Sequence, residues 1–140
     1  MDSDREQISD VLIRYATGID RRDWALFRTC WTPDAVCDYG EVGTFEGLDA
    51  LTEFMVASHD AMGPIHHRMS NFVIDIDQSG DRANVRSYVH AVLIAVPGDK
   101  NSWIDAVGNY SDVFVRTADG WRIASRTVEI ARVLTANGVM

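Results

Sequence analysis

The sequence predicts an α+β fold, in which three N-terminal helices pack on a strongly curved, mostly antiparallel sheet. Helical spacing of apolar residues dominates the chain up to Met62, and alternation replaces it after His66. Short polar turns then divide the alternating part into four long segments. Helices followed by a run of strands are typical of this class, because the helices cover one face of the sheet. Four long strands that curve around helices leave an open mouth, so we expect a cone-shaped barrel.

Length and composition indicate a single domain, 1–140. The chain has 140 residues, of which 46% are hydrophobic and 24% charged, which is enough for one sizeable core. A net charge of −8 without a basic patch argues against nucleic acid and anionic lipid as partners. The polar first residues are unlike a signal peptide, and no apolar run reaches the length of a membrane span. We therefore expect a cytoplasmic protein with no membrane partner.

No metal or cofactor is expected. Cys30 and Cys37 are accompanied by no second Cys pair, so reduced, partly buried thiols are the favoured interpretation over zinc ligands or a disulfide framework. Asp38, Asp75 and Asp77 match no compact ligand set, and turn roles explain them adequately. The glycine-rich nucleotide motifs are absent from the sequence.

The first helix begins with Ser3 and Glu6, which have the spacing of a capping box. Gly18 lowers helix stability and lies near the predicted end. The polar stretch 20–23 breaks the helix, and Asp23 can cap a second one that Thr32-Pro33-Asp34 ends. The two apolar faces comprise Ile8, Val11, Leu12, Tyr15 and Ile19, and then Trp24, Leu26, Phe27, Cys30 and Trp31.

The rest of the chain reads as strands around one more helix. Short strands are predicted at 36–39 and 44–46, and Gly47 opens a third helix that Gly63-Pro64 stops. Long strands follow from His66 to Asp77 and over 83–96, 103–116 and 121–133, with turns at 78–81, 97–101 and 118–120. The tail 135–140 is expected to be loose.

The stretch from Gly63 to Asn71 is the best place to look for chemistry, because His66 and His67 stand side by side where the third helix gives way to a strand. With an unperturbed pKa of about 6.5, an imidazole suits proton transfer near neutral pH. Strict alternation with Phe72, Ile74 and Ile76 would turn His66 inward. A bulge between Arg68 and Asn71 would turn His67 inward instead.

Four segments carry a family resemblance: Tyr15 to Trp24, Trp31 to Ala35, His66 to Asn71, and Gly120 to Ile123. Together they resemble the SnoaL-like branch of the nuclear-transport-factor-2-like superfamily, which includes scytalone dehydratase, the bile-acid 7α-dehydratase and hexachlorocyclohexane dehydrochlorinase. The resemblance implies a cystatin-like cone with an apolar pocket between sheet and helices. It leaves the reaction open, because the superfamily also holds cyclases, isomerases and non-catalytic binding subunits.

The resemblance also implies site residues. Tyr15, Asp20 and His67 match the Tyr, Asp and His that meet in the pocket of dehydratase-like members. His90 stands where some dehydratases carry an acidic or His residue, and Arg126 matches an Arg of the dehydrochlorinase-like members. Those members carry a Lys where this chain has Tyr15, which favours a dehydratase over a dehydrochlorinase.

These five residues could carry out an elimination. His67 would be the base, oriented by Asp20, and Tyr15 would donate to a carbonyl or leaving oxygen. His90 would protonate the leaving group, and Arg126 would stabilise an oxyanion or pair with Asp20 or Glu129. Each residue also has a structural interpretation: Asp20 as a cap, Tyr15 as core, His90 as a hydrogen-bonded strand residue and Arg126 as surface charge. His59, on the third helix, is expected to face solvent.

The leading hypothesis is therefore a cofactor-independent, dehydratase-like lyase that abstracts a carbon-bound proton from a small hydrophobic substrate, cyclic or polyketide-like. The alternatives are a polyketide cyclase or isomerase that uses the same pocket, and a non-catalytic binding or assembly domain. The resemblance implies a homodimer or higher homo-oligomer in each case.

Overall fold

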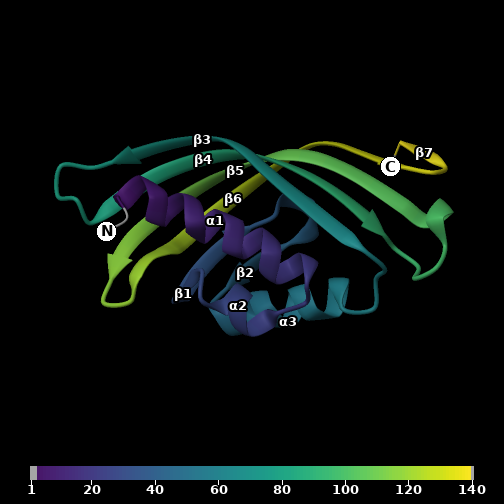
Figure 1. The fold of residues 1–140 in the computed structure, drawn as a ribbon, viewed down its shortest axis with the longest axis horizontal. Coiled ribbons are helices and arrows are strands. Elements are labelled where there is room, and N and C mark those ends of the chain that lie inside the picture. Colours follow the sequence, from purple (N-terminus) through teal and green to yellow (C-terminus); the bar gives the residue numbers. More distant parts are fainter. Residues whose placement is uncertain (1–2, 140) are drawn as a thin grey trace.

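The computed structural model describes residues 3–139, which form three α-helices and a seven-stranded sheet (Figure 1). Short 3₁₀ turns lie at Gly40–Val42 and Lys100–Ser102. The helices are α1 (Asp4–Asp20), α2 (Trp24–Arg28) and α3 (Leu48–His59). The strands are β1 (Trp31–Asp38), β2 (Thr44–Glu46), β3 (Ile65–Ile76), β4 (Arg82–Ile94), β5 (Trp103–Thr117), β6 (Gly120–Thr135) and β7 (Gly138–Val139).

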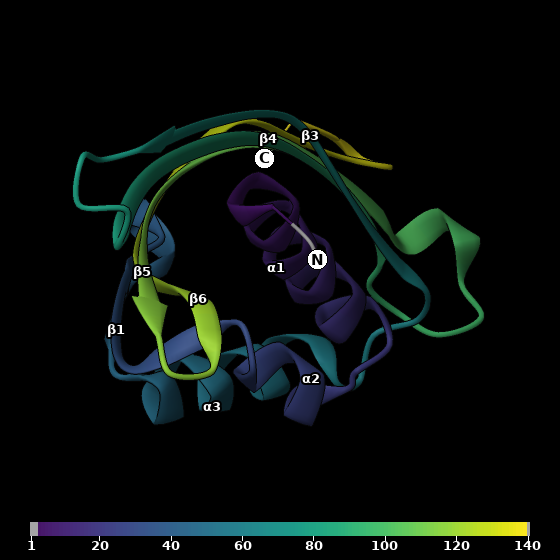
Figure 2. The ribbon, with the colours of Figure 1, turned by 60° about the vertical axis from the view of Figure 1, so that its left-hand side comes forward.

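The sheet has the order β2-β1-β6-β5-β4-β3, with β7 paired to β6. Every pairing is antiparallel except that of β1 with β6. Figure 2 shows the sheet arching over α1, while α2 and α3 lie below that helix. The α+β class and the four long hairpin strands are confirmed. In the part of the chain that the structure describes, the edge strands β2 and β3 do not pair, so the sheet is an open cone.

The predicted start of α1 is confirmed. The Ser3 side chain accepts a hydrogen bond from the Glu6 backbone N–H at 3.1 Å, which satisfies one of the free donors at the helix N-terminus. Gly18 has a packing reason: a Cβ at this position would lie 2.9 Å from the backbone nitrogen of Phe27. The glycine thus lets α2 approach α1 more closely than any other residue would.

Two predicted boundaries are wrong. The second helix ends at Arg28, and β1 begins at Trp31 and runs through Pro33. Trp31 aligns with Ile123 of β6, whose backbone N–H donates to the Cys30 carbonyl at 2.8 Å. The register of β1 shifts between Trp31 and Val36, so Pro33, which has no N–H to donate, falls in the irregular part.

The tail also differs from the prediction, because β7 pairs with the end of β6. Met140 lies outside the described residues.

The core lies between α1 and the concave face of the sheet. Its largest fully buried side chains include Phe27, Phe114 and Trp121. Cys30 and Cys37 are free, buried thiols, as predicted. None of the described helices combines the length and the apolar character that crossing a bilayer requires.

Candidate acid–base site

The site is centred on the contact between α1 and the first part of β3. Asp20 is the last residue of α1, and its Oδ1 lies 2.7 Å from Nδ1 of His67. The backbone N–H of His67 also donates to Asp20, 2.9 Å from Oδ2. A carboxylate only accepts, so Nδ1 of His67 carries the proton and Nε2 holds the lone pair. The predicted Asp–His pair is thus present, with the orientation that a base needs.

A bulge decides which histidine faces inward. The pairing of β3 with β4 shifts between Ser70 and Val73, and Asn71 has a left-handed φ of 55°. Before the bulge His67 points inward and His66 is exposed, while after it Ile74 is buried. The His67 side chain is only 7% exposed. The bulge, which was one of two possibilities that the sequence allowed, is therefore present, and it lies between Ser70 and Val73.

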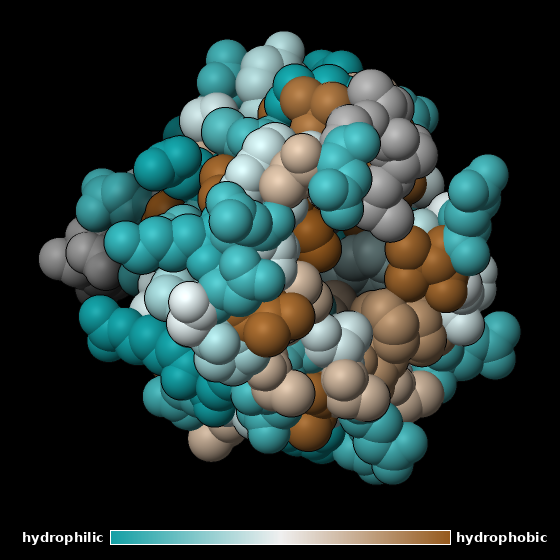
Figure 3. All heavy atoms as spheres, turned by 90° about the vertical axis from the view of Figure 1, so that its right-hand side faces the viewer, coloured by the Kyte–Doolittle hydropathy of each residue, from teal (hydrophilic) through white to brown (hydrophobic). Residues whose placement is uncertain are grey.

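His67 faces a cavity of about 230 Å³. The space lies between α1, α3 and the concave face of β4, β5 and β6, and apolar side chains make up most of its wall. In Figure 3, which looks at the right-hand side of Figure 1, apolar side chains border a hollow on this face. The apolar lining residues are Ile19, Val42, Phe54, Met55, Met62, Val89, Ala91, Leu93, Ala106, Val107, Val128 and Ile130.

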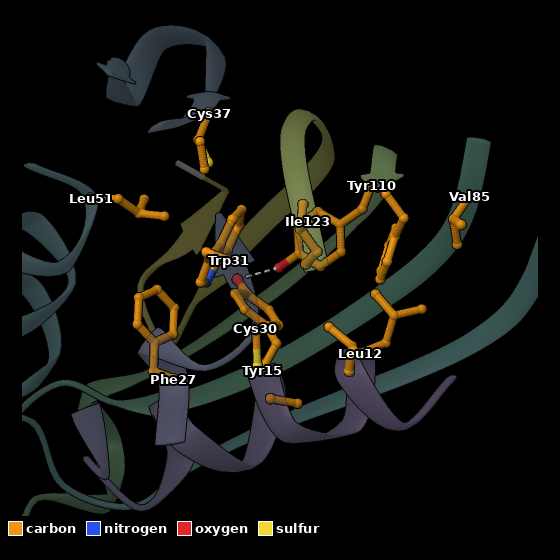
Figure 4. Packing of buried hydrophobic residues seen from close by; sticks show 14 of the residues in the cluster. Leu12, Tyr15, Phe27, Cys30, Trp31, Cys37, Leu51, Val85, Tyr110 and Ile123 are labelled. Carbon is orange, nitrogen blue, oxygen red and sulfur yellow. Dashed lines mark hydrogen bonds between the residues drawn. The ribbon is translucent and has the colours of Figure 1, made fainter. Parts of the chain in front are cut away.

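Three tyrosines line the same cavity, and their hydroxyls lie close together. The hydroxyl of Tyr15 lies 3.1 Å from that of Tyr110 and 3.4 Å from that of Tyr39 (Figure 4 shows Tyr15 pointing from α1 toward Tyr110). Burial raises the pKa of all three phenols above the usual value of 10, so they stay protonated. Three hydroxyls that share at most two mutual hydrogen bonds keep one proton to donate to a ligand.

Arg126 lies behind the tyrosines and does not reach the cavity. Its guanidinium carbon is 3.7 Å from the ring centre of Tyr110 and 4.2 Å from that of Tyr15. Two hydrogen bonds, of 2.7 and 2.9 Å, join it to Asp112, and both side chains are fully buried. The predicted partners Asp20 and Glu129 are wrong, because Asp112 stands directly opposite Arg126 in the β5–β6 ladder. Burial raises the pKa of Asp112, and Arg126 opposes that rise.

His90 points away from the cavity. Its neighbours Val89 and Ala91 line the cavity wall, so alternation turns His90 to the convex face. There its Nε2 lies 3.1 Å from Asp105, which Arg132 also contacts at 2.8 Å. The structure therefore does not bring His90 to the other predicted site residues, and its structural interpretation fits the geometry.

His59 is the residue that the sequence prediction misplaced. It lines the cavity beside His67, with the two ring centres 6.3 Å apart. Burial lowers its pKa below the usual 6.5. The signal was present, since His59 follows the buried Leu51 and Met55 at intervals of eight and four residues, which places it on the same helix face.

Arg22 ties the two histidine-bearing parts of the site together. Its guanidinium donates to the backbone carbonyls of Asp20, His59, Met62 and Gly63. The end of α1 is thereby fixed to the end of α3 and to the loop that leads into β3.

Metal binding finds no support in residues 3–139, where no group of three or more His, Cys, Asp and Glu side chains is placed to hold an ion. The turn roles of two aspartates are clear. Asp38 accepts from the Gly40 N–H at 2.8 Å, and Asp77 accepts from Ser79.

Comparisons with known proteins agree with this architecture. The chain is 32% identical over 125 residues to an uncharacterised protein of Mycobacterium tuberculosis, covering 89% of this chain and 83% of that protein. A crystal structure of a Kribbella flavida protein shares the fold with a TM-score of 0.85 at 29% identity, covering 96% and 95% of the two chains.

A second solved structure, of a candidate scytalone dehydratase from Novosphingobium aromaticivorans, has a TM-score of 0.81 at 21% identity, covering 91% and 83% of the chains. Proteins of the scytalone dehydratase and nuclear-transport-factor-2 type thus share this fold. The model of the SnoaL-like domain matches residues 3–127, and the chain therefore belongs to the SnoaL-like domain family.

Proposed function

We propose that the protein is a cofactor-independent, dehydratase-like lyase acting on a small hydrophobic, cyclic substrate. The observation that carries the proposal is the Asp20–His67 pair in the wall of an apolar cavity, whose imidazole Nε2 has no hydrogen-bond partner among residues 3–139. A base oriented by a carboxylate in a water-poor space suits abstraction of a proton from carbon. The candidate scytalone dehydratase with the same fold is named for the same type of reaction.

The reaction requires a substrate with a carbonyl group and a hydroxyl on the β-carbon. Nε2 of His67 takes the proton from the carbon next to the carbonyl, and Asp20 stabilises the imidazolium that forms. The spare tyrosine proton donates to the carbonyl oxygen, where negative charge develops. The imidazolium then returns the proton to the β-hydroxyl as the carbon–oxygen bond breaks. One water leaves and one carbon–carbon double bond remains, so atoms and electrons balance.

The tyrosine cluster favours dehydration over dehydrochlorination. Tyr15, Tyr39 and Tyr110 are neutral donors, held protonated by burial, and a neutral donor matches a carbonyl oxygen. Arg126 lies behind their rings, where its charge makes the hydroxyls stronger donors without touching the substrate.

The test uses a two-ring β-hydroxy ketone in deuterium oxide. Exchange at the carbon next to the carbonyl is followed by nuclear magnetic resonance, and water loss by the absorbance of the conjugated product. We expect His67→Ala to reduce exchange by more than about a hundredfold. His66→Ala is the matched control, because this neighbour lies on the outer face of the same strand and should leave the rate unchanged. Equal exchange in both variants would remove the proposal.

The same measurement separates the alternatives. An isomerase or cyclase starts with the same proton transfer, so it would show His67-dependent exchange without loss of water. A binding domain would bind the ketone and show no exchange above buffer. The expected homo-oligomer stays a prediction.

A further inference from the structure

His59 is a second imidazole in the wall of the proposed active site. It is the last residue of α3, and its ring is tilted by 46° to that of His67 at a centre-to-centre distance of 6.3 Å. The Tyr15 ring lies 6.5 Å from that of His67, and the Tyr110 ring lies 5.7 Å from that of Tyr15. With Tyr39, five polar rings thus line a cavity that is otherwise largely apolar.

The hydrogen bonds of His59 fix its tautomer. Nδ1 lies 3.0 Å from the backbone carbonyl of Met55, and a carbonyl can only accept. Nδ1 therefore carries the proton, and the Ser58 hydroxyl, 2.8 Å away, is placed to accept as well. Nε2 is left with its lone pair, and no side chain of the described residues is hydrogen-bonded to it.

His59 is held in the neutral form. Burial lowers the pKa of His59, and electrostatic repulsion by Arg22, and by His67 whenever it is protonated, lowers it further, while the Met55 carbonyl and Asp20 act in the opposite direction. A neutral imidazole with a free Nε2 is a hydrogen-bond acceptor. It differs from His67, whose Nδ1 is hydrogen-bonded to the carboxylate of Asp20.

We propose that Nε2 of His59 accepts a hydrogen bond from a hydroxyl group on the ring of the substrate. This inference rests on the proposed function, because it concerns the same cavity, and it deepens that function by naming a required group. A neutral acceptor keeps the hydroxyl that it binds, since it has no proton at Nε2 to give. The bound hydroxyl is therefore not the one that leaves as water, and the substrate carries at least three oxygen functions.

Affinity for two simple probes tests the assignment. Binding of 2-naphthol is measured by calorimetry, and binding of naphthalene, which lacks the hydroxyl, by competition. His59→Leu should weaken 2-naphthol binding about five- to tenfold, the value of one neutral hydrogen bond, and leave naphthalene unchanged. His59→Gln should restore the preference for 2-naphthol over naphthalene, because the amide oxygen of Gln can take the place of Nε2. His66→Leu is the outward-facing control.

Several outcomes would overturn the assignment. These are an unchanged hydroxyl preference in His59→Leu, an equal loss for both probes, or loss of the preference only in His67→Leu. Should His59→Leu fail to fold, nitrogen-15 resonances of the wild-type histidines replace it. The Nε2 signal of His59 should then move with 2-naphthol and stay in place with naphthalene, and a fixed signal with both would be equally decisive against the proposal.

The two proposals fail in different ways. If the proposed reaction is wrong, the ketone shows no His67-dependent exchange, while the His59-dependent preference for 2-naphthol persists. If the His59 assignment is wrong, exchange depends on His67 as expected, and the hydroxyl preference does not depend on His59.

Discussion

Two histidine–aspartate pairs in this protein have similar lengths and different surroundings. His67 and Asp20 meet at 2.7 Å in the cavity wall, whereas His90 and Asp105 meet at 3.1 Å on the convex face. The inner imidazole is 7% exposed and the outer one 40%. Asp105 is also shared with Arg132, which draws its charge away from His90. Residue type and distance alone therefore do not identify a base. Burial, an unshared carboxylate and a position in the cavity wall distinguish the pair that we propose as the base.

The difference between the two pairs is tested most directly by replacing the aspartate of each pair with asparagine. Asp20→Asn should reduce proton exchange by about a hundred- to ten-thousandfold, because the amide no longer fixes the useful tautomer or stabilises the imidazolium. Asp105→Asn should leave exchange within about twofold of the wild type. Rates for the two variants are measured on the same ketone, and a similar loss in both would mean that the outer pair also matters.

A buried and an exposed arginine can be compared in the same way through their effects on the free energy of unfolding. Arg126→Met leaves Asp112 as an uncompensated buried charge, so we expect the free energy of unfolding in urea to fall by about 3–5 kcal/mol. Arg132→Met removes a contact on the surface and should cost less than about 1 kcal/mol. A small loss for Arg126→Met would show that Asp112 is readily protonated in the folded protein.

Loss of a single tyrosine hydroxyl should have a smaller effect. Tyr15→Phe removes the middle member of the hydroxyl cluster, so Tyr39 and Tyr110 must reorient their protons. We expect exchange to slow by about ten- to a hundredfold, since one oriented donor is lost and two remain. Comparison with Tyr88→Phe, on the exposed face of β4, controls for the loss of a phenol hydroxyl. An unchanged rate would exclude Tyr15 as a donor in the reaction.

The smallest effect concerns pH. The pKa of His59 is lower in the folded protein than its usual value, so between the two values the unfolded chain binds more protons. The free energy of unfolding should therefore be constant above about pH 6.5 and fall as the pH drops below it, by at most about 1.4 kcal/mol per pH unit. His59→Gln should flatten this part of the curve in urea unfolding at several pH values. If the pH dependence of the unfolding free energy persists in the variant, it comes from other titratable groups.

Periodicity predicted the fold well, because each long strand exposes one face and buries the other, and each helix has one apolar stripe. Patterns of this kind locate elements better than their ends. Trp31 and Cys30 continue the apolar spacing of α2, yet pairing with β6 draws Trp31 into a strand. Long-range contacts of that sort are invisible in a local pattern.

The site was predictable only in part. Tyr15, Asp20 and His67 come together as expected, because the resemblance supplied contacts that spacing cannot. The outward direction of the His90 side chain follows from simple alternation with its buried neighbours Val89 and Ala91. Here alternation is a better guide than the family resemblance. The Arg126–Asp112 pair could not be predicted, since it depends on the register of two hairpin strands.

The bulge in β3 determines which face of the sheet each residue of the strand points to. Before the bulge, the odd-numbered residues face the cavity. After it, the even-numbered residues face the core. Were β3 to pair regularly with all its residues and no bulge, either the His67 imidazole or the hydrophobic residues that follow would be turned to water. Removing a single residue between Ser70 and Val73 would instead allow a regular strand in which both halves face inward. A redesign of the cavity can therefore omit the bulge only if it also omits one residue of β3.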